Sequence, residues 1–172
     1  VVRVDAAVDS VIFEYCEETL SKRLKRYAFV MPPEVTATLV RDMIAGLKHL
    51  HAMGIAHRDL KMDNMLLQTG AEARTRLKIA DYGWCCRMTE DPRAATPAFA
   101  HAYKAPEVAL LRPYGVRAVV WAAGVATREL VTGCQLWRSG KRGVTELIGH
   151  VCSDLVPDAF EDAAYEIWRG IV

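Results

Sequence analysis

The feature that most constrains this chain is the stretch 57–64, which reads His-Arg-Asp-Leu-Lys-Met-Asp-Asn. It concentrates polar and charged side chains between a helical apolar pattern and a strand-like one. Two short strand-like runs, at residues 65–67 and 77–79, flank a turn that contains glycine. This arrangement predicts that Asn64 and Asp81 lie on facing rims of one cleft. Any of these carboxylates, taken alone, would be interpreted as a surface loop residue, so the interpretation depends on the joint pattern.

Two further motifs follow residues 57–64 in a set order. Residues 81–83 read Asp-Tyr-Gly after the predicted hairpin, and residues 105–107 read Ala-Pro-Glu further along. The three motifs resemble the H-R-D-L-K-x-x-N, D-F-G and A-P-E motifs of the protein kinases, with tyrosine in place of phenylalanine. Because three motifs in this order and at these separations rarely occur by chance, the chain resembles the large-lobe portion of a eukaryotic-type serine/threonine protein kinase.

The resemblance implies a role for each motif residue in phosphoryl transfer, which asks a protein mainly to position groups and neutralise charge. Asp59 would accept or orient the proton of the substrate hydroxyl. Lys61 would reach the transferring phosphate, as in kinases that act on serine and threonine. Asn64 and Asp81 would hold Mg²⁺ through hard oxygen ligands. The implied cofactors are ATP and Mg²⁺, and the implied partners are a protein substrate with a serine or threonine acceptor and a regulatory protein.

The N-terminal residues resemble the last part of a kinase small lobe. Runs rich in β-branched residues at 1–4 and 11–13 predict a β-hairpin. In the family pattern, Glu14 and Cys16 belong to the hinge that meets the adenine edge of ATP through backbone groups. Leu66 belongs to the apolar floor beneath the adenine. Without the downstream motifs, the N-terminal residues would be interpreted as a plain strand followed by the start of a helix.

Helical patterns dominate the rest of the chain. Leu20 and Leu24 lie four apart among charged residues in the segment 18–27. Apolar residues recur at helical spacing over 33–53, and Gly54 marks the end of that pattern. Further helical patterns cover residues 116–132, 144–151 and 159–168.

These patterns predict an α+β fold class. The expected architecture is a protein-kinase-like fold with a mainly helical C-terminal lobe and a small β remnant of the N-terminal lobe. We interpret residues 1–172 as a single partial kinase domain. Residues 1–16 would hold the last small-lobe strands and the hinge, and residues 17–172 a large lobe that is short at its C-terminal end.

The segment 81–107 contains proline and has little periodicity, so it is predicted to be a loop. Its resemblance to a kinase activation segment makes Thr96 the better candidate for a regulatory phosphate. Arg58 would pair with that phosphate, and Glu107 would complete the A-P-E motif. An unmodified loop threonine is the alternative interpretation.

The chain also departs from the family pattern. Its residues do not match the glycine-rich loop, the strand lysine that pairs with the α- and β-phosphates, or the helix glutamate that holds this lysine. Val119 stands where the family has an aspartate that accepts backbone N–H bonds from the catalytic loop, and each unsatisfied buried donor costs about 1–3 kcal/mol. Ala100 stands where a threonine usually bridges the catalytic Asp and Lys. These departures predict that the isolated 172-residue chain does not transfer phosphate.

Two hypotheses about function follow. The first is a serine/threonine protein kinase represented by an incomplete catalytic domain, which the intact residues 57–64 favour. The alternative is a pseudokinase-like binding or scaffold module without phosphotransfer activity, which the departures favour. The subfamily stays open, because residues 103–107 and 136–137 resemble the cyclin-dependent and MAP kinases, whereas residues 77–84 resemble the Aurora and calmodulin-dependent kinases.

Charge and cysteine content argue against several other classes of protein. Basic and acidic residues nearly balance, for a formal net charge of +1, so neither a nucleic-acid partner nor a membrane surface is predicted. No apolar run is long enough to span a bilayer. The five cysteines are odd in number and lack zinc-ligand spacing. They are interpreted as reduced thiols of an intracellular protein, cytoplasmic and/or nuclear.

Overall fold

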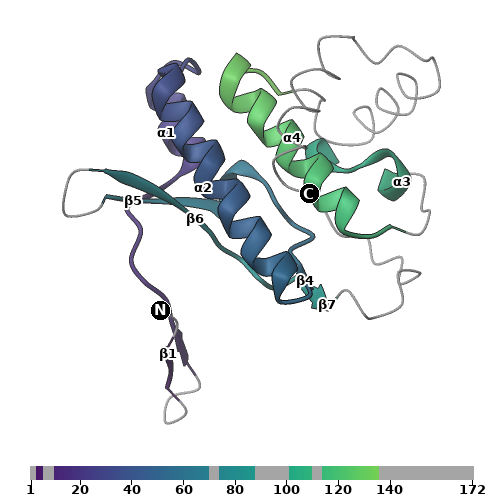
Figure 1. The fold of residues 1–172 in the computed structure, drawn as a ribbon. Helices are drawn as coiled ribbons and strands as arrows, with labels where there is room; N and C mark the ends of the chain where they lie inside the picture. The colour runs from purple at the N-terminus through teal and green to yellow at the C-terminus, as the bar shows by residue number, and fades with distance from the viewer. Residues whose placement is uncertain (1–2, 6–9, 70–73, 88–100, 110–113, 136–172) are drawn as a thin grey trace.

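A computed structural model describes residues 3–5, 10–69, 74–87, 101–109 and 114–135 of the chain (Figure 1). The described helices are α1 (Leu20–Arg26), α2 (Pro33–Ala52), α3 (Pro106–Ala109) and α4 (Val116–Thr132), with 3₁₀ turns η1 (Met62–Asn64) and η2 (His101–Tyr103). The described strands are β1 (Arg3–Asp5), β2 (Ser10–Ile12), β3 (Glu18–Thr19), β4 (Ile55–Ala56), β5 (Met65–Thr69), β6 (Thr75–Ile79) and β7 (Cys86–Arg87). The strands are short, so the helices supply most of the core.

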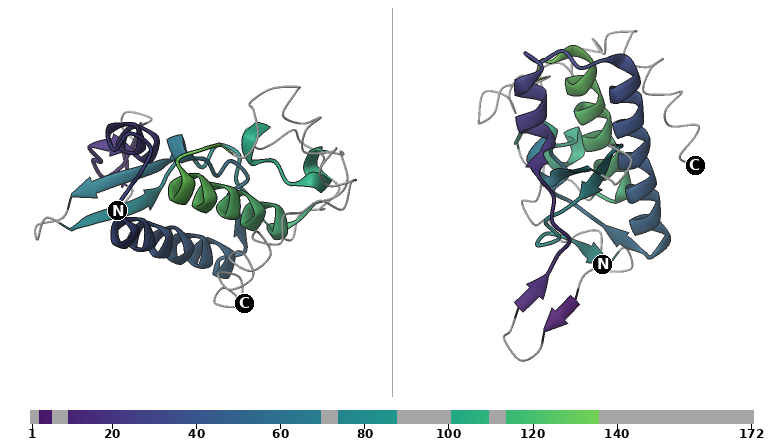
Figure 2. Two further views of the ribbon diagram at one scale, coloured as in Figure 1. Left: turned by 90° about the horizontal axis from the view of Figure 1, so that it is seen from above. Right: turned by 90° about the vertical axis from the view of Figure 1, so that its left-hand side faces the viewer.

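The described strands form three separate antiparallel ladders, β1–β2, β3–β5–β6 and β4–β7. The β1–β2 hairpin projects away from the helices (Figures 1 and 2). In the three-stranded ladder, Leu66 of β5 lies between Thr19 on one side and Lys78 on the other. Strands β4 and β7 pair the residues just before His57 with those just after Gly83. Two of the predicted motifs are therefore joined by backbone pairing.

Helix α2 leads into the stretch 57–64. Pro33 occupies its first turn, where a backbone N–H is not needed, and Glu34 lies near its positive end. Its buried side chains recur every three or four positions: Thr36, Leu39, Met43, Leu47 and Leu50. Gly54 follows with φ of 71°, a left-handed conformation that suits glycine. The helix thus ends where the sequence predicts.

Helix α1 is fixed at its start by polar contacts and along one face by burial. The Thr19 hydroxyl accepts the N–H of Lys22 at 3.2 Å. The carboxylate of Glu18 accepts hydrogen bonds from the guanidinium groups of Arg23 and Arg26. The face that carries Leu20 and Leu24 is buried. The helix therefore contributes to the core while its charged residues face outward.

The core lies where α2 packs between α4 and the three-stranded ladder (Figure 2). Helix α4 turns a face of mainly small residues inward: Ala118, Val119, Ala122, Ala123, Val125, Ala126, Thr127 and Leu130. Small side chains let two helices approach closely. Gly133 ends the helix with φ of 68°, as the sequence predicts.

The structure confirms the N-terminal hairpin and the helices at 33–53 and 116–132. The prediction that 81–107 is a loop is wrong in part, because β7 and η2 lie within this segment and α3 begins in it. Strand β7 forms because Cys86 and Arg87 meet β4, a partner that no local pattern reveals. The predicted helices at 144–151 and 159–168 lie outside the described residues. Within the described part of the chain, none of the helices combines the length and hydropathy needed to cross a membrane.

Candidate active site

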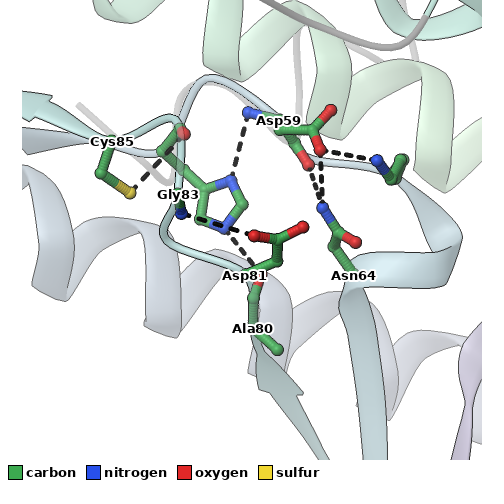
Figure 3. Close-up of polar contacts among 8 residues, drawn as sticks. Asp59, Asn64, Ala80, Asp81, Gly83 and Cys85 are labelled. Carbon is green, nitrogen blue, oxygen red and sulfur yellow. Dashed lines mark hydrogen bonds and ion pairs between the residues drawn. The ribbon is translucent and has the colours of Figure 1, made fainter. Parts of the chain in front are cut away.

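Asp59 lies at the centre of a polar cluster on the loop between β4 and η1. Its Oδ2 accepts hydrogen bonds from Lys61 Nζ at 2.6 Å and from Asn64 Nδ2 at 2.9 Å. Asn64 Nδ2 also donates to the Asp59 carbonyl at 2.9 Å (Figure 3). Asp59 is only 5% exposed, and a buried carboxylate needs such partners. The structure therefore brings together the three side chains that the sequence assigns to catalysis.

The loop presents these polar groups because its apolar residues are anchored beneath it. Leu60 and Met62 are buried in the core. Arg58 has φ of 63°, a left-handed conformation that costs a residue other than glycine about 1–2 kcal/mol. The surroundings must fix such a conformation, and here Arg58 Nε donates to the carbonyl of Trp84 at 2.7 Å.

His57 connects the two sides of the cluster. It is fully buried. Its Nε2 donates to the carbonyl of Ala80 at 3.0 Å, and its Nδ1 accepts the N–H of Asp59 at 3.3 Å. This pattern requires a neutral ring with the proton on Nε2. Burial lowers the pKa of His57, which favours the same neutral form.

Asp81 lies across from Asn64. The N–H of Ala80 donates to the carbonyl of Asn64 at 2.9 Å, so the two backbones are joined beside these side chains. Asp81 has φ of 64°, and its Oδ1 accepts the N–H of Gly83 at 3.4 Å. Figure 3 shows the side chains of Asp59, Asn64 and Asp81 in one small region. The structure thus places the predicted pair together with the predicted catalytic aspartate.

The oxygens of Asn64 and Asp81 fit a magnesium ion that phosphate oxygens complete. Asn64 uses its amide nitrogen on Asp59, which leaves its amide oxygen for a cation, and Asp81 is exposed. In the part of the chain that the structure describes, no group of three His, Cys, Asp or Glu side chains could hold a metal alone. Mg²⁺ usually takes one or two carboxylates and completes its shell with water and substrate phosphates. The residues therefore fit a nucleotide-dependent metal site.

Leu66 lies on the face of the ladder away from the core. Its neighbours Met65 and Leu67 are buried, whereas Leu66 is half-buried, because successive side chains of a strand face opposite sides. Lys78 lies directly across from Leu66 on β6. This face of the ladder, on which Leu66 is half-buried, is where the family resemblance predicts that the adenine packs.

The segment that holds Glu14 and Cys16 is tied to the same ladder. Lys78 Nζ forms an ion pair with Glu14 at 3.2 Å, and this contact lowers the pKa of Glu14. Gln68 Nε2 donates to the carbonyl of Tyr15 at 3.1 Å. Cys16 is half-buried, and burial raises the pKa of its thiol. The sequence carries no local signal for the Glu14–Lys78 pair, because only the strand register brings these residues together.

Of the remaining residues that the sequence singles out, some are described by the structure and some are not. Glu107 is half-buried on α3, whereas Thr96 and Ala100 lie outside the described residues. Val119 is fully buried in the core and brings no carboxylate to the loop. One loop amide nevertheless has an acceptor, since the N–H of Asp59 donates to the imidazole of His57.

Two further contacts were not expected from the sequence. The Tyr103 hydroxyl, just before α3, donates to Glu129 Oε2 of α4 at 2.6 Å, and burial, reinforced by Glu129, raises the pKa of Tyr103. Cys85 Sγ donates to the carbonyl of His57 at 3.6 Å, and burial raises the pKa of this thiol to about 11. The partners lie 26 and 28 residues apart, so no short motif could mark them.

Comparison with known proteins places this arrangement among kinases. The sequence model of the family described as "Protein kinase domain" matches residues 4–163. The chain is 42% identical over 98 residues to the serine/threonine-protein kinase CLA4 of Saccharomyces cerevisiae, a match that covers 56% of this chain and 11% of that protein. It is 34% identical over 125 residues to CLA4 of Candida albicans and 32% identical over 124 residues to the serine/threonine-protein kinase STE20 of Yarrowia lipolytica. Each of these two matches covers 72% of this chain, but only 12% and 11% of the respective relative.

A solved structure shares the fold. The chain is similar to a protein in the crystal structure of the yeast RNA Pol II CTD kinase CTDK-1 complex, with a TM-score of 0.71 and 24% sequence identity. The match covers 87% of this chain and 48% of that one. At this identity the likeness shows the fold alone, and it confirms the predicted protein-kinase-like fold of the α+β class.

Proposed function

This chain belongs to the protein kinase family, and we propose that it carries the large-lobe portion of a serine/threonine protein kinase. The proposed reaction transfers the γ-phosphate of ATP to a serine or threonine hydroxyl of a protein substrate. The observation that carries the proposal is the buried carboxylate of Asp59, held by Lys61 at 2.6 Å and by Asn64 at 2.9 Å. The names of the curated relatives support the choice of acceptor.

Asp59 would act on the acceptor hydroxyl. Lys61 and Asn64 both contact its Oδ2, so Oδ1 would accept the hydroxyl proton of the substrate. Lys61 carries a compact positive charge on a flexible stem. From its place beside Asp59 it would reach the phosphoryl oxygens as they approach the acceptor. Positioning and charge neutralisation of this kind supply most of the catalysis in phosphoryl transfer.

Asn64 and Asp81 would hold the magnesium ion that accompanies ATP. When bound, Mg²⁺ supplies positive charge to the phosphate oxygens. Asn64 would contribute its amide oxygen because its nitrogen is occupied by Asp59. The hydrogen bond between the backbones of Asn64 and Ala80 supports this assignment, because it keeps the two ligands adjacent.

The isolated 172-residue chain is proposed to be inactive. The γ-phosphate must lie in line with the acceptor, and a misplacement of about 1 Å can cost 10²-fold in rate. Within the described residues, no group supplies the phosphate clamp that a kinase small lobe provides. Val119, which is fully buried, gives no carboxylate to the catalytic loop. Because the matches cover only 11% and 12% of the respective relatives, the activity is proposed for the complete gene product.

Transfer from radiolabelled ATP to a generic serine/threonine substrate tests the proposal. In the complete gene product, Asp59→Asn should lower the transfer rate by about 10²–10⁴-fold, the contribution of a positioned general base. Asp63→Asn is the matched control: it makes the same change at an exposed carboxylate on η1, which follows the loop, and it should leave the rate unchanged. Equal transfer by the unchanged and Asp59→Asn proteins would remove Asp59 from the reaction.

The same assay on the 172-residue chain tests the proposed inactivity. No transfer above that of its Asp59→Asn variant is expected. Transfer by the chain that disappears in the variant would show that the large lobe suffices.

A second function, a pseudokinase-like binding or scaffold module, is favoured by the burial of Val119 where the family has an aspartate. If the complete gene product shows no transfer although Asp59 is intact, this function replaces the first.

The proposal extends to partners and location. A regulatory protein would act on the chain, and a phosphate on Thr96 would pair with Arg58. The structure records Cys16, Cys85, Cys86 and Cys134 as free thiols, which supports an intracellular protein, cytoplasmic and/or nuclear.

A further inference from the structure

The turn that carries Asp81 is closed by a hydroxyl group that phenylalanine, the usual residue of the motif, would lack. The Tyr82 hydroxyl donates to the carbonyl of Ile79 at 2.9 Å. We infer that this hydroxyl is a positioning group that holds the turn so that the Asp81 carboxylate faces Asn64. The inference rests on the proposed function, in which Asp81 holds Mg²⁺.

Asp81 needs such support because its backbone is in an unfavourable conformation. Its φ of 64° lies in the left-handed region, which aspartate adopts more readily than most residues but still at a cost, so neighbouring contacts help to hold it. The contact from Gly83 N–H to the Asp81 carboxylate is long, at 3.4 Å. The Tyr82–Ile79 bond spans the strained residue, since it joins the residue after Asp81 to the last residue of β6.

The hydroxyl and the ring of Tyr82 make separate contacts. The ring packs edge-on against the imidazole of His57, with centroids 5.5 Å apart, and phenylalanine would keep this contact. Only the hydroxyl reaches the Ile79 carbonyl. A tyrosine phenol is protonated at neutral pH, so it can donate this bond. Because Tyr82 is 43% exposed, water competes for the bond and the expected effect is moderate.

Cys85 reports whether the turn is closed. Its Sγ donates to the His57 carbonyl at 3.6 Å, and burial raises its pKa to about 11. The thiolate is the reactive form, so Cys85 should react slowly with an alkylating reagent while the turn is closed. Cys134 is exposed and serves as an internal reference in the same molecule.

The test is alkylation by iodoacetamide near neutral pH, with the rate at each cysteine followed by mass spectrometry of its peptide. Tyr82→Phe should speed the labelling of Cys85 about three- to tenfold, the range for a lost hydrogen bond. The labelling of Cys134 should stay unchanged, and the midpoint of unfolding should fall by no more than the loss of one hydrogen bond explains. Tyr27→Phe is the matched control, because Tyr27 is 42% exposed and lies away from the turn. It should leave Cys85 unaffected.

Two outcomes of the labelling would overturn the inference. One is an unchanged Cys85 rate in Tyr82→Phe, which would mean that the hydroxyl does not hold the turn. The other is a rise shared equally by Cys134, which would mean that the whole fold has loosened. Tyr82→Leu, which removes ring and hydroxyl together, shows in addition how much the ring contact with His57 contributes.

The link to Asp81 is tested by titrating Mg²⁺ into the complete gene product with ATP. Tyr82→Phe should raise the Mg²⁺ concentration needed for binding by a similar factor, without changing the metal-free affinity for ATP, and Asp81→Asn should abolish the metal dependence. Faster Cys85 labelling with an unchanged Mg²⁺ requirement would overturn the positioning role. If the unchanged protein shows no metal-dependent binding, the metal assignment of the proposed function fails, and the labelling of Cys85 alone decides whether Tyr82 holds the turn.

Discussion

His57 and Ala80 help to position Asp59 and Asp81, although neither residue takes part in the proposed reaction. The imidazole accepts the N–H of Asp59 on one nitrogen and donates to the carbonyl of Ala80 from the other. Both ring nitrogens are thus committed to backbone groups on the two sides of the cluster. Because protonation would convert the acceptor nitrogen into a donor, the charge state of His57 bears on the stability of the site.

Protonation of His57 should destabilise the fold. Burial lowers the pKa of His57, and also that of His51, below the 6.5 of a free imidazole. The unfolded chain therefore binds more protons than the folded chain as the pH falls below 6.5, and the free energy of unfolding decreases. His57→Gln should flatten this decrease between about pH 7 and pH 5, measured by urea denaturation at several pH values. Glu14 and Glu18 have lowered pKa values, so they act at lower pH.

His49→Gln is the matched control for the pH experiment. His49 lies on α2, and its side chain is exposed to solvent. It should keep the pH dependence of the unchanged chain. An equally steep decrease in His57→Gln would contradict the role of His57 and would assign the effect to His51.

Helix α4 meets the loop between α1 and α2 at Gly133, where the two elements leave no room for a side chain. A Cβ atom on Gly133 would lie 1.9 Å from the backbone oxygen of Phe29. Gly54, which ends α2, has nearly the same φ, 71° against 68°, but nothing lies within 4 Å of its Cβ position. Substitutions at the two glycines can therefore be compared: both carry the cost of the backbone conformation, but only the one at Gly133 carries the cost of close packing.

Alanine at Gly133 should destabilise the chain more than alanine at Gly54. Gly54→Ala adds only the left-handed strain, about 1 kcal/mol. Gly133→Ala adds this strain and the displacement of the Phe29 backbone, for a total of about 2–4 kcal/mol. Urea denaturation of the two variants measures the difference. Equal losses would mean that the Phe29 loop yields without cost.

The molecule as a whole exposes large apolar side chains where its N-terminal hairpin leaves the helical body. Ile12, Phe13 and Tyr15 are 52%, 60% and 78% exposed, and the hairpin projects from the rest of the fold (Figure 1). Phe13 therefore faces water, whereas Leu66 is half-buried. An isolated two-stranded hairpin is only marginally stable, and clustered exposed apolar residues favour association.

The isolated chain should therefore self-associate as its concentration rises, because Phe13 and its neighbours can bury apolar surface against a second copy. Static light scattering over a concentration series measures the association. Phe13→Ser should weaken it, whereas Val131→Ser, at a side chain that is 64% exposed on the end of α4, should change it little. A monomer at every concentration, or an equal effect of both substitutions, would contradict a role for the hairpin.

Local patterns in the amino-acid order were enough to predict the family, the long helices and the residues of the proposed site. The stripe from Thr36 to Leu50 repeats with the period of a helix, and glycine marks its end. Residues 57–64 and 81–83 carry their chemistry within a few consecutive positions. Such signals are readable because helical periodicity and short motifs depend on neighbours along the chain.

Other features depend on residues that only the folded chain brings together. Strand β7 exists because β4 lies beside it. The pair of Glu14 and Lys78 forms because β5 pairs on one side with β3, which closely follows Glu14, and on the other with β6, which carries Lys78. His57 reaches Ala80 across 23 positions. These residues become partners only when the whole core packs, because that packing fixes both the strand register and the loop conformation. The residues that hold the proposed catalytic groups in place therefore emerge from tertiary contacts, even though the groups themselves can be recognised in short motifs.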